Sequence, residues 1–314
     1  TVTTDDDGIA KSKELYLGKY TVIEKTAPNG FVHNGTKYDI ELTYAGQNVS
    51  VTSTELSVYN ERQRVSVSLK KIMAEDKTFG IGNNGEITSV RFGVYAGEDI
   101  KANNGDVIPK DALITFANCD KNGNISFDCD LPVGFKWYAK EIATDEHYIL
   151  SNIKYEFDTE YQGQNVKVID IEVNNDKAIE NNLIYGSVKG LKVDRETQEV
   201  IKGATFGLFF ANTSELTEKN AVLTAVTDES GVFVFNNIPY GEYLIKELKP
   251  TDGYLDNEDV FTVTIKDNEQ VVELTAINDK VPELKTTATV NGKKEVIAKG
   301  EISIKDTVEY KHLV

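Results

Sequence analysis

The chain is poor in the residue types from which most catalytic and metal sites are built. Its 314 residues include three histidines, two cysteines, one methionine and one tryptophan. His33, His147 and His312 show no metal-ligand spacing and no triad arrangement with a serine or cysteine. The sequence therefore argues against an enzyme that acts on a separate substrate, and it predicts no cofactor and no metal ion.

Basic residues and long apolar runs are also scarce. The chain has 34 Lys and Arg against 51 Asp and Glu, which gives a formal net charge of -17. Binding to nucleic acid or to anionic lipid needs clustered Lys and Arg, so we expect neither partner. Because no apolar run is long enough to cross a bilayer, the sequence predicts no membrane span.

What the chain does contain is typical of an ordered β protein. It is 40% hydrophobic, with 15 Tyr, 13 Phe and only 6 Pro. Valine, isoleucine and threonine are abundant, and these residues together with the aromatics favour strands. The composition therefore predicts an all-β fold.

One motif occurs three times, with an aromatic residue seven positions after a glutamate. The copies are EKTAPNGF at residues 24–31, EIATDEHY at 141–148 and ELKPTDGY at 247–254. Each glutamate ends an alternation whose same-face neighbours are apolar or aromatic, so we expect each carboxyl on the core face of a strand. The copies are about 110 residues apart, a length that suits one sandwich domain each.

An Asp-rich turn precedes each copy, at residues 5–8, 120–123 and 228–231. The second turn begins a segment whose alternating oxygen-bearing side chains resemble a calcium-binding loop. However, this segment has Ile125 in place of the glycine and Leu131 in place of the bidentate glutamate of such a loop. A β-turn capped by an aspartate side chain is therefore favoured over a metal site.

Polar residues recur at two more positions on the expected core faces. After each glutamate an apolar alternation ends on an asparagine, and the two modules whose beginnings are present carry a lysine in matching phase on the first strand. The asparagines are Asn60, Asn181 and Asn278, and the lysines are Lys71 and Lys192. In the middle module Lys70 and Asn182 remain alternatives, although strand phase favours Lys71 and Asn181.

A buried lysine, glutamate and asparagine need either a hydrogen-bonded network or a chemical bond, because unpaired buried charges are costly. Burial favours the neutral lysine amine and the protonated carboxyl. Such a carboxyl would donate to the asparagine carbonyl, accept a proton from the attacking amine and pass one to departing ammonia. The sequence therefore predicts two self-formed isopeptide bonds, Lys71–Asn181 and Lys192–Asn278, promoted by Glu141 and Glu247.

The two cysteines, Cys119 and Cys129, flank the second Asp-rich turn. Their spacing suits a cross-strand disulfide, which would fit an oxidising, extracellular setting. Two buried thiols that face a core are equally compatible with the pattern. The sequence leaves both alternatives open.

Four segments in combination resemble the CnaB-type, or SpaA-like, domains of Gram-positive surface proteins and pilins. They are GSVKGLKVD at 186–194, the TDESG turn at 227–231, YGEYLIKELKPTDGY at 240–254 and the IND around Asn278. The resemblance implies tandem transthyretin-like, Ig-like antiparallel β-sandwiches. It also implies that a lysine on the first strand joins an asparagine on the last strand, with the glutamate promoting closure.

The resemblance divides the chain into three CnaB-like parts and a different tail. Residues 185–281 match best, and residues 63–184 also fit. Residues 1–62 look like the C-terminal part of a truncated domain, whose Glu24 and Asn60 await a lysine that would precede this sequence. The chain opens without an initiator methionine or a signal peptide, so we expect it to be an excerpt of a longer protein.

The tail, residues 282–314, is similar to the beginning of the threonine–glutamine ester-bonded domains of adhesin stalks. That similarity implies Thr286 or Thr287 as the nucleophile of an ester bond, whose glutamine partner is absent here. The alternative is that both are ordinary strand threonines.

Short connections between the predicted modules indicate a stalk. Asn60 stands five residues before Val65, and Asn181 stands five before Gly186, which leaves little flexible linker. We therefore expect a rod-like structural segment of a bacterial adhesin or pilus-like protein, which is not an enzyme beyond its single self-crosslinking reaction. The expected partners are neighbouring domains of the same chain, peptidoglycan through an anchor outside this sequence, and a host or matrix ligand bound by a distal domain.

The expected location is extracellular, attached to the cell wall of a Gram-positive bacterium. Two other functions remain alternatives. The first is a carbohydrate- or matrix-binding module, for which surface tyrosines such as Tyr138 and Tyr161 would be needed, whereas Trp137 is expected to pack inside. The second is a polymerising pilin, for which residues 107–110 (VIPK) faintly resemble a sortase-acceptor motif.

Overall fold

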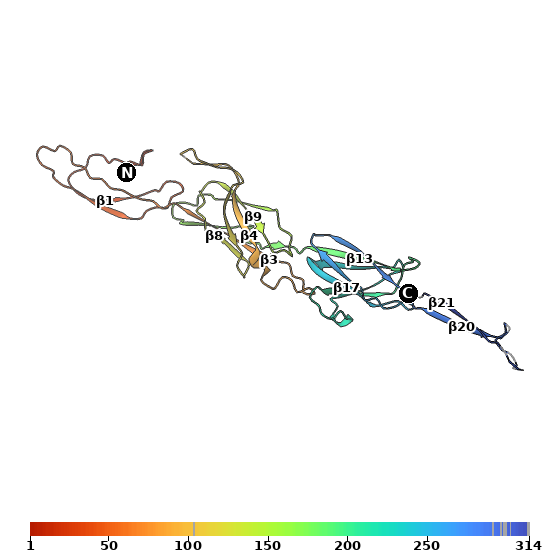
Figure 1. The fold of residues 1–314 in the computed structure, drawn as a ribbon. Coiled ribbons are helices and arrows are strands. Elements are labelled where there is room, and N and C mark those ends of the chain that lie inside the picture. The colour runs from red at the N-terminus through yellow and green to blue at the C-terminus, as the bar shows by residue number, and fades with distance from the viewer. Residues whose placement is uncertain (103, 291, 296, 298–299, 302, 313–314) are drawn as a thin grey trace. The chain divides into compact units, whose positions relative to one another are not determined.

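The computed structural model describes residues 1–102, 104–290, 292–295, 297, 300–301 and 303–312. Strands make up 45% of the structure and helices 2%, so the predicted all-β fold is confirmed (Figure 1). Contacts within the chain separate it into two units. The first contains residues 1–71, 90–142 and 152–179, and the second contains residues 72–89, 143–151 and 180–314.

Residues 1–62 contribute a two-stranded antiparallel sheet to the first unit. Strand β1 (Gly18–Ile23) pairs with β2 (Lys37–Leu42) in a register that runs from Gly18 opposite Leu42 to Ile23 opposite Lys37. The first Asp-rich turn lies before this sheet, where the Asp5 side chain accepts hydrogen bonds from the backbone N–H groups of Asp7 and Ile9.

Residues 63–184 form two main sheets with a core between them. One sheet has the strand order β10-β9-β4-β7, and the other has the order β11-β3-β12 with β8 also paired to β3. Both sheets contribute fully buried side chains, including Phe92 and Ala139 from the first and Val67, Ile125 and Ile169 from the second. The elements are β3 (Arg64–Met73), η1 (Glu86–Ser89), β4 (Arg91–Ala96), β5 (Ile100–Lys101), β6 (Val107–Ile108), β7 (Leu113–Asn118), β8 (Asn124–Phe127), β9 (Lys136–Ala143), β10 (Lys154–Asp158), β11 (Val168–Glu172) and β12 (Ile179–Asn181).

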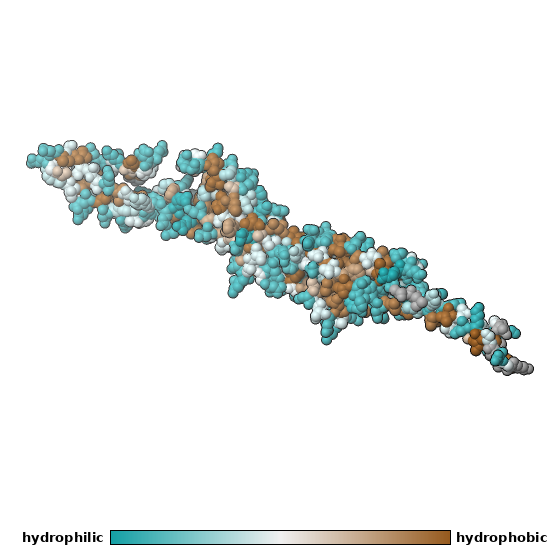
Figure 2. Space-filling model, in the orientation of Figure 1, coloured by the Kyte–Doolittle hydropathy of each residue, from teal (hydrophilic) through white to brown (hydrophobic). Residues whose placement is uncertain are grey.

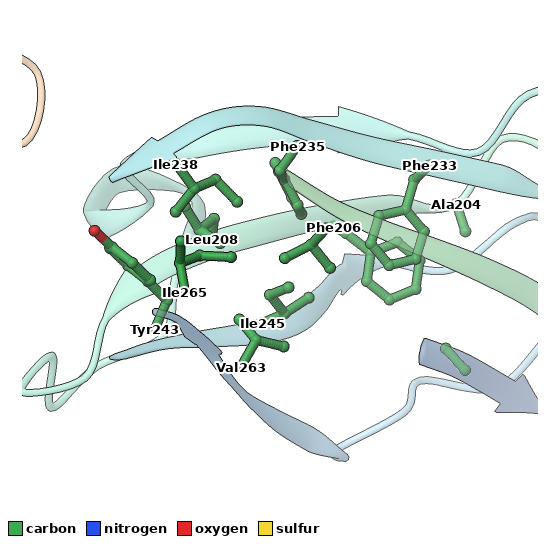
Figure 3. Packing of buried hydrophobic residues seen from close by; sticks show 12 residues of the cluster. Ala204, Phe206, Leu208, Phe233, Phe235, Ile238, Tyr243, Ile245, Val263 and Ile265 are labelled. Atoms are coloured by element: carbon green, nitrogen blue, oxygen red, sulfur yellow. The ribbon is translucent and has the colours of Figure 1, made fainter. Parts of the chain in front are cut away.

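Residues 185–281 also form two sheets, with orders β16-β13-β19 and β15-β14-β17-β18. Side chains from both sheets meet in a core that includes Phe206, Phe235 and Ile245 (Figure 3). Alternation along each strand sends apolar residues inward, as the sequence period of two requires. The elements are β13 (Tyr185–Asp194), β14 (Thr205–Phe210), η2 (Glu218–Asn220), β15 (Leu223–Val226), β16 (Val232–Pro239), β17 (Gly241–Lys249), β18 (Val260–Ile265) and β19 (Val271–Asn278).

The sandwiches are not antiparallel throughout. β13 and β19 are parallel neighbours, with Lys192 opposite Ala276 and Asp194 opposite Asn278, and β11 pairs with β3 in parallel as well. Parallel strands need a long connection, and here most of the module lies between β13 and β19. The first and last strands of residues 185–281 are therefore side by side, as the family resemblance implied.

The second unit also contains a packed boundary around residue 185. Phe79, from the loop of residues 74–85, lies edge-on against Tyr243 and Phe210, with ring centroids 5.7 and 6.0 Å apart. The Tyr185 hydroxyl donates to Asp76 Oδ2 at 2.9 Å. The loop of residues 74–85 is thus bound to the sandwich of residues 185–281 by side-chain packing.

The last two strands, β20 (Glu283–Thr289) and β21 (Lys305–Lys311), form an antiparallel hairpin. Thr286 lies opposite Val308 and is exposed, whereas Thr287 lies opposite Thr307 and is half-buried. Neither residue is placed with a glutamine partner by this pairing. The ester-bond assignment stays a prediction.

Cys119 and Cys129 are free thiols, of which Cys119 is buried and Cys129 is half-buried. The turn between them closes through hydrogen bonds from Asp120 N to Asn124 O and from Gly123 N to Asp120 O. This turn is closed at Asn124, several residues before Cys129. Burial raises the pKa of both thiols to about 11, so neither is a reactive thiolate near neutral pH.

Hydrophilic side chains cover much of the visible surface (Figure 2), in keeping with the 51 acidic residues of the chain. None of the helices in the described part of the chain has the length and apolar character needed to cross a bilayer.

Candidate functional site

Lys192, Glu247 and Asn278 meet in the core of residues 185–281, each supplied by a different strand. Lys192 follows Val188 and Gly190 on the inward face of β13, Glu247 follows Tyr243 and Ile245 on β17, and Asn278 ends β19. Their side chains are buried, with residue exposures of 0%, 6% and 2% respectively. Three polar groups are therefore removed from water together, as the sequence phase predicted.

The three side chains form a closed set of contacts. Lys192 Nζ donates to Asn278 Oδ1 at 2.5 Å, and Asn278 Nδ2 donates to Glu247 Oε2 at 2.7 Å. Lys192 Nζ also lies 3.3 Å from Glu247 Oε1. The carboxyl group thus presents one oxygen to the lysine nitrogen and the other to the asparagine nitrogen.

One detail differs from the sequence-based mechanism, in which the glutamate donates to the asparagine carbonyl. In the structure Glu247 faces the amide nitrogen of Asn278, and the carbonyl oxygen faces Lys192. The physical reason is a second acceptor, because Asn278 Nδ2 also donates to the backbone carbonyl of Leu255 at 3.1 Å. If the Asn278 amide were reversed, its Oδ1 would face the Leu255 carbonyl oxygen, and neither atom could donate a hydrogen bond to the other.

A buried aromatic stack lies beside the site. The rings of Phe206 and Phe233 are 4.0 Å apart and nearly parallel (Figure 3), and Lys192 Nζ lies 5.6 Å from the Phe206 ring centroid. Gly190 makes room for this stack, because a Cβ atom at residue 190 would come within 2.0 Å of the Phe233 ring. The glycine in the strand pattern is therefore explained by close packing beside the lysine.

Burial decides the charge state of the nucleophile. Desolvation lowers the pKa of Lys192 from its ordinary value, and the nearby Glu247 only partly opposes that shift. A lowered pKa increases the fraction of neutral amine, which is the nucleophilic form. The core of this module thus brings an amine of lowered pKa into contact with an amide.

Asp194 lies two residues beyond Lys192 on β13 and is 1% exposed. Its Oδ1 accepts the backbone N–H groups of Thr197 and Glu196, and its Oδ2 accepts the Tyr254 hydroxyl at 3.1 Å and lies 3.4 Å from Lys280 Nζ. These contacts, the Thr197 hydrogen bond above all, hold the pKa of Asp194 well below its usual range. Asp194 therefore joins the ends of β13 and β19 as a buried carboxylate.

We expect Asp194→Asn to lower the free energy of unfolding at pH 7 by about 1–3 kcal/mol, because buried donors lose a charged acceptor. The folded-state pKa is depressed, so Asp194 stabilises the fold at pH values above its unfolded pKa of about 4, and that stabilisation is lost as the pH falls further. Urea unfolding at pH 7 and pH 3 should therefore show a smaller acid loss for Asp194→Asn than for the parent. The exposed Asp252→Asn is the control, and equal acid losses in all three proteins would contradict this role.

Residues 1–62 repeat the glutamate–asparagine contact without a lysine. Asn60 Nδ2 donates to both carboxylate oxygens of Glu24, at 2.9 and 2.8 Å, and to the backbone carbonyl of Val32 at 3.0 Å. Both side chains are only half-buried. The pair predicted from sequence phase is therefore brought together in a more open setting.

In residues 63–184, Lys71, Glu141 and Asn181 are each 1% exposed. Lys71 Nζ donates to the Ile179 carbonyl at 2.9 Å, and Asn181 Nδ2 donates to Thr144 Oγ1 at 2.8 Å. The two alternative residues are exposed. Lys70 forms an ion pair with Asp176 at the surface, and Asn182 is also exposed. Strand phase thus selected the buried member of each pair, while the Lys71–Asn181 bond itself stays a prediction.

Sequence reasoning missed Thr144, Asp194 and the Phe206–Phe233 stack. Thr144 carried a signal, since it lies inside the repeated motif, whereas the Phe206–Phe233 stack and the contacts of Asp194 with Tyr254 and Lys280 join residues that are distant in sequence.

The tyrosine proposed as a surface group, Tyr138, is in fact 5% exposed, because it stacks on Tyr95 at 5.0 Å and lies beneath Lys154. Trp137 is buried, as expected, and donates to Thr159 Oγ1.

The second Asp-rich turn has the geometry of a capped turn. Asp120 Oδ1 accepts the backbone N–H groups of Asn122 and Asn124, each at 2.8 Å. Across the described residues there is no group of three or more His, Cys, Asp or Glu side chains placed to hold a metal ion.

Two parts of the chain match a known family of protein domains. The family of SpaA-type prealbumin-like fold domains matches residues 1–57 and 186–280. This finding confirms the resemblance to SpaA-like domains that the sequence motifs indicated.

A curated relative, a collagen adhesin of Staphylococcus aureus, is 25% identical over 129 residues, which are 41% of this chain and 11% of that protein. Among solved structures, the Bacillus anthracis TIE protein has a TM-score of 0.64 and 24% identity, over 88% of this chain and 44% of that chain. The major pilin subunit BcpA of Bacillus cereus has a TM-score of 0.37 and 19% identity, over 89% and 94% of the two chains. The chain thus spans less than half of the adhesin and of the TIE protein, and the likeness to the TIE protein is one of fold.

Proposed function

We propose that this chain, two parts of which match SpaA-type prealbumin-like domains, is a structural stalk segment of a bacterial surface adhesin or pilus-like protein. Its modules are held closed by intramolecular lysine–asparagine isopeptide bonds. The observation that carries the proposal is the buried contact of Lys192 Nζ with the Asn278 amide, beside both oxygens of Glu247.

The reaction needs no group beyond these three side chains. The neutral Lys192 amine attacks Cγ of Asn278, which forms the Nζ–Cγ bond and a tetrahedral intermediate. Glu247 accepts the proton that Nζ releases and delivers a proton to Nδ2, after which the Cγ–Nδ2 bond breaks and ammonia leaves. The dry core favours each step, because the amine stays neutral and water does not compete for the carbonyl.

The position of the bond gives it a mechanical role. Lys192 and Asn278 lie on the parallel neighbours β13 and β19, which are the first and last strands of the module. Tension along the chain would pass from one strand to the other through the covalent bond. The intervening strands would then not need to resist extraction by hydrogen bonds worth about 1 kcal/mol net each.

Side-chain packing supports a close connection between the loop of residues 74–85 and the sandwich of residues 185–281. Phe79 contacts Tyr243 and Phe210, so the loop before β4 and the following sandwich belong to one packed unit. In this proposal the distal ligand-binding domain and the cell-wall anchor lie in other parts of a longer, extracellular protein.

Residues 63–184 would carry a second bond, Lys71–Asn181, promoted by Glu141. In residues 1–62, Glu24 and Asn60 form the same glutamate–asparagine contact. The burial of Tyr138 removes one support from the carbohydrate-binding alternative, and the stalk is the function that the buried site favours.

The intact mass of the recombinant 314-residue chain tests the proposal. We expect a mass below the value calculated from the sequence by two ammonia molecules, and tryptic mapping should recover the Lys71–Asn181 and Lys192–Asn278 branched peptides. A chain of the full calculated mass would contradict the cross-link, and with it the proposed basis of the stalk.

A further inference from the structure

The loop after the glutamate strand is built in the same way in all three repeats. The aromatic residue seven positions after the glutamate forms a bridge to the residue two positions after the asparagine: Phe31 to Arg62, Tyr148 to Leu183 and Tyr254 to Lys280. The next residue then donates its backbone N–H to the carbonyl that follows the asparagine, as Val32 N to Glu61 O, Ile149 N to Asn182 O and Leu255 N to Asp279 O. The repeated motif therefore ties this loop to the strand end that carries the asparagine.

The same loop supplies an oxygen to the asparagine amide nitrogen in each repeat. Asn278 Nδ2 donates to the Leu255 carbonyl at 3.1 Å, and Asn60 Nδ2 donates to the Val32 carbonyl at 3.0 Å. In residues 143–181 the loop oxygen is a side chain instead, because Asn181 Nδ2 donates to Thr144 Oγ1 at 2.8 Å. The sources differ, but each gives the amide nitrogen an acceptor from the loop.

We infer that this loop oxygen is a positioning group for the isopeptide reaction, an inference that rests on the proposed function. An amide side chain can be reversed by rotation about its last bond, which exchanges the carbonyl oxygen and the nitrogen. A backbone carbonyl at the nitrogen position favours one orientation, because the reversed amide would place an oxygen against an oxygen, whereas the Thr144 hydroxyl, which can also donate, contributes an acceptor in the orientation seen. With Leu255 O in place, Asn278 turns its carbonyl to Lys192 and its nitrogen to Glu247.

The loop oxygen also stays hydrogen-bonded to Nδ2, the nitrogen that leaves as ammonia. When the Nζ–Cγ bond has formed, Nδ2 takes up a proton through Glu247 and departs as ammonia, while Lys192 keeps one proton on the new amide. Before departure the two hydrogens of Nδ2 are directed to Glu247 Oε2 and Leu255 O. In the tetrahedral intermediate the lone pair of Nδ2 is no longer delocalised into the carbonyl, so Nδ2 becomes basic and takes the proton from Glu247 when its own hydrogen bond to Oε2 is exchanged for that donation.

Thr144 makes the inference testable, since a side chain is replaced more easily than a backbone carbonyl. In the full chain, we expect Thr144→Val to slow formation of the Lys71–Asn181 bond about ten-fold, because a buried amide N–H loses its acceptor. Thr144→Ser keeps a hydroxyl and should restore the parent rate. The rate is followed by tryptic mapping of samples taken at intervals after purification.

Two internal references separate positioning from a folding defect. The Lys192–Asn278 bond of the same molecules should form at the parent rate, which reports that the chain is intact. Thr251→Val removes a hydroxyl that donates to Lys202 O and does not contact an asparagine, so it should leave both bonds at parent rates.

Each outcome bears on a different statement. If Thr144→Val forms the Lys71–Asn181 bond as fast as the parent, or if Thr144→Ser is as slow as Thr144→Val, the loop oxygen does not position the amide. In either case the proposed function stands, provided that the parent loses ammonia. If the parent itself keeps both ammonia equivalents, it is the proposed function that fails.

Discussion

Glu247→Ala should leave the module of residues 185–281 without its cross-link, and the intact mass should rise by one ammonia relative to the parent. The alanine variant has no group to move a proton from Lys192 Nζ to Asn278 Nδ2, whereas Glu247 places an oxygen beside each nitrogen. The bond would close a loop in which its two residues are 86 positions apart. Loss of such a closure costs on the order of 4–5 kcal/mol in the chain-entropy model.

For a module of this size, that loss corresponds to a fall in melting temperature of roughly 20–30 °C. Differential scanning calorimetry of the parent and the variant measures it, and mass spectrometry reports the chemistry in the same samples. Glu258→Ala is the matched control, because Glu258 is an exposed glutamate that pairs with Lys246 at the surface. A Glu247→Ala protein that still loses ammonia at the parent rate would remove Glu247 from the mechanism.

Phe233→Ala should both destabilise the module and slow the cross-linking reaction. Phe233 is 1% exposed and stacks on Phe206, so its removal leaves a cavity and should cost about 3–5 kcal/mol of unfolding free energy. Water that enters beside Lys192 would relieve the desolvation that lowers its pKa. The pKa of Lys192 would then rise, and less of the amine would be in its neutral, reactive form.

The control for Phe233→Ala lies on the same strand. Val234 is 42% exposed and points to the opposite face of β16, so Val234→Ala should change stability by less than about 1 kcal/mol and leave the reaction rate unchanged. Chemical unfolding gives the stability, and ammonia loss followed over time gives the rate. Raising the pH should partly recover the rate of Phe233→Ala, because deprotonation restores the nucleophile. A rate that does not depend on pH would contradict the link between burial and reactivity.

The sequence predicted the identity of the site residues because strand phase is a local property. Lys192, Glu247 and Asn278 each follow an apolar alternation of period two, and a residue in that phase faces the core whatever the remaining topology. The same reasoning separated Lys71 from Lys70 and Asn181 from Asn182, and the structure buries Lys71 and Asn181. The all-β class and the SpaA-like resemblance also followed from patterns that are continuous in sequence.

Phase alone does not determine which atoms meet. The sequence-based mechanism oriented the glutamate toward the asparagine carbonyl, and the structure turns Asn278 the other way because Leu255 supplies an acceptor. In the same way, Cys119 and Cys129 had a spacing compatible with a disulfide, and in the structure they are free thiols. Tyr138 was expected at the surface, but Tyr95 and Lys154 pack against its ring.

By itself the sequence determined that this protein is built from repeated β modules with a lysine, a glutamate and an asparagine on core faces, since those facts depend on composition, period and register. Only the tertiary structure decided that β13 and β19 are parallel neighbours and that the stacked rings of Phe206 and Phe233 lie beside Lys192. It also decided that a loop oxygen orients the amide. Those contacts join residues far apart in the chain, and their distances are set by packing rather than by any local pattern.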